Sequence, residues 1–136
     1  MTDPVLLPAG ESPLATYLAH LARGELAYQV DADGLAVFYP RVGAPAGRRG
    51  PLRWQVSRGL GTVYAATWIA PKGEPPYNVA LIDMDEGFRL MSRVESVAAD
   101  QVRIGMRVRM RVQPARAEDD PMPVFDPVER AEGIAR

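Results

Sequence analysis

Three arginines recur at every second position near the carboxyl end of the sequence. They are Arg107, Arg109 and Arg111, and no acidic residue occurs between positions 101 and 116. In an extended strand these side chains share one face and lie roughly 7 Å apart. Guanidinium groups bind phosphates and carboxylates through paired hydrogen bonds. The row therefore predicts contact with phosphates or with an acidic partner surface, the alternative being the solvated outer face of a half-buried strand.

A proline-rich loop and an apolar helical stripe are two further candidates for binding. Pro75 and Pro76 precede Tyr77, and a loop stiffened by proline loses less entropy when it binds. Tyr17 and Leu18 belong to a stripe of apolar residues at helical spacing. Such a stripe either packs on the chain's own core or forms an apolar patch for another protein. We predict that these five residues and the arginine row bind a partner or a ligand.

The side chains with catalytic potential lack the partners that catalysis requires. His20 is the single histidine, and no serine lies in a nucleophile-elbow pattern. The acidic cluster at 83–86 runs into a strand pattern instead of reaching the distal ligand of a calcium loop, so it predicts a hairpin turn. The chain contains no cysteine. We therefore expect no catalytic residue, no metal and no cofactor, and a protein that is not an enzyme.

Tyr64 and Trp68 raise the alternative of nucleic-acid binding. They lie four residues apart on one face of a predicted strand. In some proteins that bind single strands, aromatic rings at such positions stack on bases. Packing in the core or at an interface would explain the two aromatic residues equally well. The formal net charge of −1, from 16 basic and 17 acidic residues, argues against a nucleic-acid partner. A stand-alone module that binds single-stranded nucleic acid is kept as an alternative hypothesis.

The elements that position these residues begin with a helix over 13–23. Ser12 suits the cap, Pro13 suits the first turn and Gly24 suits the end. Residues 25–51 alternate short apolar patches with turn residues, which predicts small hairpins and loops without a second core.

A strand pattern follows from Leu52 to the end of the chain. Five strands are predicted, with one helical turn near Ala98–Val102 after the third. They span Leu52–Ala70, bent at its glycines, then Tyr77–Met84, Phe88–Val94, Met106–Val112 and Met122–Phe125. This order is typical of an OB-fold barrel. We expect four parts: an arm and helix (1–24), the hairpins (25–51), the barrel (52–128) and a tail (129–136).

A family resemblance rests on five short stretches of sequence, taken together with their order and spacing. They are GLGTVY at 59–64, PPYNVALI at 75–82, DEGFRLM at 85–91, VRIGMRV at 102–108 and PVF at 123–125. Through them, residues 13–128 resemble the zinc-ribbon and OB-fold family known as domain of unknown function 35, which is associated with thiolase-like enzymes. The resemblance implies an accessory, non-catalytic subunit, the alternative within this class being an acyl-CoA enzyme in its own right. The accessory subunit would bind a thiolase-like or other acyl-CoA enzyme, with the helix at the contact, and would shape the CoA channel, so that CoA is a further expected ligand.

The family's zinc ribbon would fall on residues 25–51. Its four cysteine positions correspond to Val30, Asp33, Ala44 and Gly47. One carboxylate and three side chains without a donor atom cannot hold zinc tetrahedrally. We therefore expect a degenerate, metal-free, rubredoxin-like ribbon in front of the barrel.

The amino-terminal residues lack the basic start and apolar run of a signal peptide. The longest nearly apolar run, 63–70, is far shorter than the about 20 residues of a membrane helix. We expect a cytoplasmic protein without a membrane partner.

Overall fold

The computed structural model describes residues 12–128, so the predicted arm before them and the tail after them lie outside the described residues. Helix α2 spans Pro13–Ala22, within one residue of the prediction. Ser12 Oγ accepts a hydrogen bond from the backbone N–H of Ala15 at 3.0 Å, and Gly24 turns the chain away at a φ of 85°. No helix in residues 12–128 is long and apolar enough to cross a membrane.

A small antiparallel sheet follows the helix. It contains β1 (Ala27–Val30), β2 (Ala36–Val37) and β3 (Arg53–Val56) in the order β2-β1-β3. Every residue of β1 is buried. Tyr28 and Val30 join the same core cluster as residues of the larger sheet, so the segment adds hairpins without a second core, as predicted.

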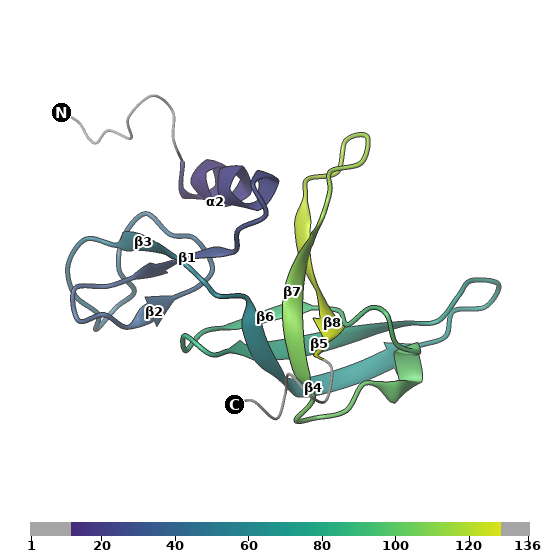
Figure 1. Cartoon of the computed structure of the whole chain (residues 1–136). Coiled ribbons are helices and arrows are strands. Elements are labelled where there is room, and N and C mark those ends of the chain that lie inside the picture. The colour runs from purple at the N-terminus through teal and green to yellow at the C-terminus, as the bar shows by residue number, and fades with distance from the viewer. Residues whose placement is uncertain (1–11, 129–136) are drawn as a thin grey trace.

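The larger sheet has five strands in the order β6-β5-β4-β7-β8 (Figure 1). The strands are β4 (Leu60–Ile69), β5 (Tyr77–Met84), β6 (Arg89–Ser92), β7 (Arg107–Gln113) and β8 (Met122–Pro127), with the short helix η2 (Ala99–Gln101) between β6 and β7. All neighbouring strands are antiparallel. The mainly β, OB-type fold with one helical turn after the third strand is confirmed.

The barrel is less closed than predicted. The edge strands β6 and β8 are joined through one parallel bridge, Val94 to Phe125, instead of a continuous ladder. The N–H of Glu95 donates to the carbonyl of Phe125 at 2.6 Å, and the N–H of Phe125 donates to the carbonyl of Arg93 at 3.0 Å. β6 ends at Ser92, whose Oγ donates to the carbonyl of Pro123 in β8 at 2.8 Å, and the backbone bonds to β8 come from the residues just after it.

The predicted strand Leu52–Ala70 is wrong in one respect, since it forms two strands in different sheets. β3 pairs with β1, while β4 begins at Leu60 and pairs with β5 and β7. The bend lies at Gly59, whose φ is 82°. Gly61 is required for close packing, because a Cβ there would lie 2.8 Å from the carbonyl oxygen of Asp83.

The far ends of β4 and β5 extend beyond the sheet as a two-stranded arm, here called the β4–β5 arm (66–77) (Figure 1). On its other side β4 pairs with β7 only through Leu60–Thr62, so the arm has no third strand in the described part of the chain. Trp68 and Tyr77 are about half exposed there.

One aromatic stack joins the small sheet to the large one. Phe88 follows the β5–β6 turn and stacks on Tyr28 and Phe38, with ring centroids 4.7 Å and 4.9 Å apart. Phe88 and Tyr28 are each 6% exposed. Burial of stacked aromatic rings adds to the hydrophobic contribution of the core, so the two sheets share one core.

Candidate functional site

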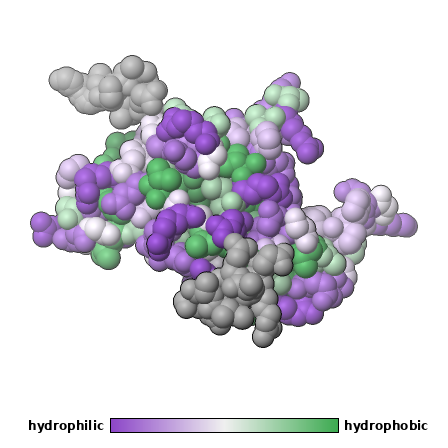
Figure 2. Space-filling model, viewed as in Figure 1, coloured by the Kyte–Doolittle hydropathy of each residue, from purple (hydrophilic) through white to green (hydrophobic). Residues whose placement is uncertain are grey.

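An apolar groove of about 550 Å³ lies between helix α2, strand β6 and the start of β8. We call it the α2 groove. Its lining side chains are mostly apolar and come from four segments: Leu14, Tyr17, Leu18 and Leu21; Phe38 and Tyr39; Arg89, Leu90 and Met91; and Asp120, Pro121, Met122 and Pro123. Figure 2 shows hydrophobic surface beside α2, on the side that faces the β7–β8 hairpin.

The helix supplies the groove with one rigid wall. Tyr17 is 4% exposed and packs edge-on against Phe38 and Tyr39, with centroids 5.7 Å and 5.5 Å away. Burial raises the pKa of Tyr17, so its phenol stays neutral. Leu18 is half-buried beside it. Both helix residues predicted to bind therefore line the groove, although they also pack on the chain's own core.

Exposed apolar side chains surround this wall. Leu14 is 46% exposed, Tyr39 55% and Met91 70%. Apolar groups that gather on one surface are typical of protein contacts. The sequence did not indicate Tyr39 or Met91, because they reach the groove from separate segments that only the tertiary fold brings together.

In the arginine row, Arg107 is bound to a carboxylate of the same chain. Its Nη1 and Nη2 donate to the two oxygens of Asp85 at 2.8 Å and 2.9 Å, and Nη1 also donates to Thr62 Oγ1 at 3.0 Å. The hydrogen bonds from Arg107 lower the pKa of Asp85. This guanidinium group ties the β5–β6 turn to β7.

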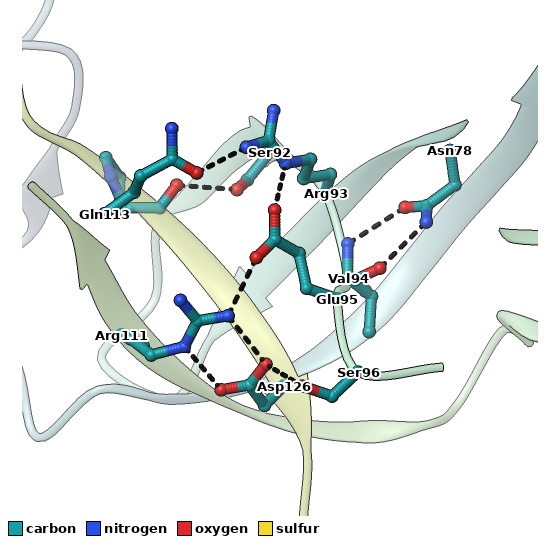
Figure 3. Close-up of polar contacts among 10 residues, drawn as sticks. Asn78, Ser92, Arg93, Val94, Glu95, Ser96, Arg111, Gln113 and Asp126 are labelled. Atoms are coloured by element: carbon teal, nitrogen blue, oxygen red, sulfur yellow. Dashed lines mark hydrogen bonds and ion pairs between the residues drawn. The ribbon is translucent and has the colours of Figure 1, made fainter. Parts of the chain in front are cut away.

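Arg111 is held by two carboxylates at the point where β6 and β8 meet (Figure 3). Its Nε donates to Asp126 Oδ2 at 2.8 Å, and its Nη2 donates to Glu95 Oε1 at 2.8 Å. Glu95 also accepts from Arg93, and Asp126 accepts from Ser96 Oγ at 2.9 Å. The guanidinium groups of Arg107 and Arg111 are therefore engaged within the chain, by acidic residues distant in sequence.

The proline-rich candidates lie elsewhere, in the β4–β5 arm. Pro75, Pro76 and Tyr77 are exposed. Pro76 and Tyr77 line a smaller pocket of about 260 Å³, which Glu95 also lines. Glu95 lines this pocket and also binds Arg111, whereas Tyr17 and Leu18 lie in the α2 groove, whose lining residues are different.

The other polar candidates form local contacts. His20 Nδ1 lies 2.7 Å from Glu25 Oε1, and the hydrogen bond from His20 is the main cause of the lowered pKa of Glu25. Arg89 Cζ lies 3.5 Å from the centroid of the Tyr64 ring, a cation–π contact that covers one face of the ring. Within residues 12–128, no group of three or more His, Asp or Glu side chains could hold a metal ion.

Comparisons with known proteins agree with this architecture. A family model described as the C-terminal OB-fold domain of ChsH2 matches residues 54–113. The 3-oxo-4,17-pregnadiene-20-carboxyl-CoA hydratase alpha subunit of Mycobacterium tuberculosis (strain ATCC 25618 / H37Rv) is 29% identical over 111 residues, which is 79% of this chain. The chain spans only about a third of that relative, 36% of its length.

A solved structure described as the Ltp2-ChsH2(DUF35) aldolase is also similar. It superposes with a TM-score of 0.71 at 27% identity, and the match covers 89% of this chain and 98% of that one. The prediction that the chain is not an enzyme is contradicted, because these relatives are named as a hydratase subunit and an aldolase. Residues 54–113 are similar to the C-terminal OB-fold domain of ChsH2, and the predicted resemblance to the DUF35 family is confirmed.

Proposed function

We propose that the chain is a subunit of an acyl-CoA-processing enzyme and contacts its partner subunit through the α2 groove. The names of the hydratase subunit and of the aldolase support the class of enzyme. The groove supports the contact, because it combines a rigid aromatic wall with the exposed side chains of Leu14, Tyr39 and Met91. A thiolase-like enzyme is the partner that the family resemblance implies.

The arginine row has a different part in this proposal. CoA phosphates at Arg107 or Arg111 would compete with Asp85, Glu95 and Asp126, which already bind these guanidinium groups. We therefore assign both arginines to holding the sheet together, and CoA to the assembled enzyme. Binding of nucleic acid has no support among the relatives.

Two groove variants and a matched control test the contact. Leu14→Glu and Met91→Glu each place a charge on an exposed groove side chain, whereas Ile104→Glu places one on a side chain that is 75% exposed and lies outside the groove. Each chain is co-expressed with a thiolase-like enzyme or with a hydratase partner subunit. Titration then gives the dissociation constant. We expect the groove variants to weaken binding at least tenfold, about 1.4 kcal/mol, and the control to change it less than twofold.

Turnover of an acyl-CoA by the assembled complex provides the second measurement. If the groove variants bind like the unmodified chain, the contact lies elsewhere. If neither kind of enzyme forms a complex with the unmodified chain, the proposed function itself is wrong.

A further inference from the structure

Asp31 is a fully buried carboxylate in the first loop of the small sheet. Its exposed fraction is 0%. Oδ1 accepts hydrogen bonds from the backbone N–H groups of Asp33 at 2.9 Å and Leu35 at 3.0 Å, and Oδ2 accepts from Arg48 Nε. A buried charge is tolerated when it is both paired and hydrogen-bonded, and Asp31 meets both conditions.

Arg48 brings the second loop to this carboxylate. Besides its contact with Asp31, its Nη2 donates to the carbonyl oxygens of Leu35 at 3.0 Å and Ala36 at 2.9 Å. One guanidinium group therefore binds three positions of the first loop. The backbone N–H of Ala32 also donates to the carbonyl of Arg49 at 2.7 Å. The two loops are thus joined at one place, by residues 17 positions apart in sequence.

These are the two loops in which the resembling family would carry zinc, and the residues present do not fit that metal. The four ligand positions hold Val30, Asp33, Ala44 and Gly47. Asp33, the one donor among them, lies 3.9 Å from Arg49. A zinc site needs four convergent ligands of the thiolate, imidazole or carboxylate kind, and the buried carboxylate next to these positions already holds a guanidinium cation.

We propose that the Asp31–Arg48 pair is a metal-independent cross-link, which holds the two ribbon loops together in place of zinc. A bound metal would join the two loops through one buried centre, and the Asp31–Arg48 pair does the same, since it binds groups from both loops. It also differs from a surface ion pair, because both carboxylate oxygens and the guanidinium donors are used. Removing Arg48 leaves the charge of Asp31 buried without compensation. Removing Asp31 leaves the half-buried guanidinium group of Arg48 without its anionic partner.

The test compares Asp31→Asn, Arg48→Met and the double variant in the full chain. Asp33→Asn with Arg49→Met is the matched control, because this neighbouring pair is exposed, at 49% and 74% of the two side chains. We expect each buried-pair variant to lower Tm by about 10 °C. The double variant should lower Tm by less than the sum of the single changes. Amide hydrogen exchange should accelerate at 33–36 and 48–50, and the control should resemble the unmodified chain.

Metal dependence is measured on the unmodified chain. We expect the same Tm in the presence of EDTA and after addition of zinc chloride. A stoichiometric zinc ion whose removal lowers Tm would overturn the proposal, as would buried-pair variants that behave like the control. Should a single variant not fold, Arg48→Lys keeps the charge, but its single nitrogen cannot reproduce the separate contacts of Nε with Asp31 and of Nη2 with the two carbonyls. Unchanged exchange at Leu35 and Ala36 in that variant would also count against the cross-link.

Discussion

Arg111 shows how a residue that sequence patterning assigns to a solvated face can hold two segments together. Its guanidinium group binds Glu95, just after β6, and Asp126, in β8. Hydrogen bonds from Arg111 lower the pKa of both carboxyl groups. A carboxyl group whose folded-state pKa is lowered stabilises the fold above its unfolded pKa of about 4. That stabilisation is lost as the pH falls through the lowered value.

We therefore predict that Arg111→Gln lowers the free energy of unfolding by about 1 kcal/mol at pH 7, and that its difference from the unmodified chain shrinks below about pH 4. Urea unfolding at pH 7, 5 and 3 measures this. Arg116→Gln, at an exposed position in the β7–β8 loop, is the control. A difference of the same size at pH 3 would show that Arg111 acts through packing and not through its charge.

At the scale of the elements, Asn78 extends β5 beyond its backbone ladder with β6. Its Nδ2 donates to the carbonyl of Val94 at 2.8 Å, and its Oδ1 accepts from the N–H of Val94 at 2.9 Å. Val94 is 1% exposed and forms the bridge to Phe125 in β8. The side chain of Asn78 thus fixes the segment that joins the two edges of the sheet (Figure 3).

Asn78→Ala should lower the free energy of unfolding by about 2 kcal/mol, because it leaves two buried backbone groups of Val94 without partners. Denaturant unfolding measures the loss, and hydrogen exchange at Val94 and Phe125 locates it. Gln101→Ala, at an exposed position in η2, should change stability by less than about 0.5 kcal/mol. Equal effects of the two changes would contradict the structural role of Asn78.

Local patterns predicted the elements better than their pairing. The alternation in β7 and the cap at Ser12 depend on neighbouring residues, and both predictions are confirmed. Nothing near Arg53–Val56 indicates that this segment pairs with β1 and not with the larger sheet. In the same way, the carboxylates that bind Arg107 and Arg111 lie 15 to 22 positions away. Such contacts form only when distant segments meet.

For the whole molecule, the shared core predicts one cooperative unfolding transition. Trp54 lies in β3 of the small sheet, and Trp68 lies in the β4–β5 arm of the large sheet. In the Trp54→Phe variant the fluorescence of Trp68 reports on the large sheet, and in the Trp68→Phe variant the fluorescence of Trp54 reports on the small sheet. After correction for the stability of each variant, we expect the two fluorescence signals to give the same urea midpoint. Separate transitions would show that the sheets unfold independently.

Phe88→Ala provides a stricter test of the same point. It should lower the free energy of unfolding by about 3–5 kcal/mol and shift both fluorescence reports equally, because Phe88 contacts residues of the small sheet from the large one. Met91→Ala, at an exposed position of the neighbouring strand β6, is the control.

The β4–β5 arm has a practical and biological consequence. Its tip carries Lys72, the single lysine of the chain, and this residue is exposed. Apart from an N-terminal amine, amine-reactive dyes and lysine-directed modifications such as acetylation have one target on this chain. Because Lys72 lies outside the α2 groove, a fluorophore attached there would follow assembly with a partner without occupying the proposed contact. For the same reason, the chain offers a single side chain for ubiquitin-like conjugation.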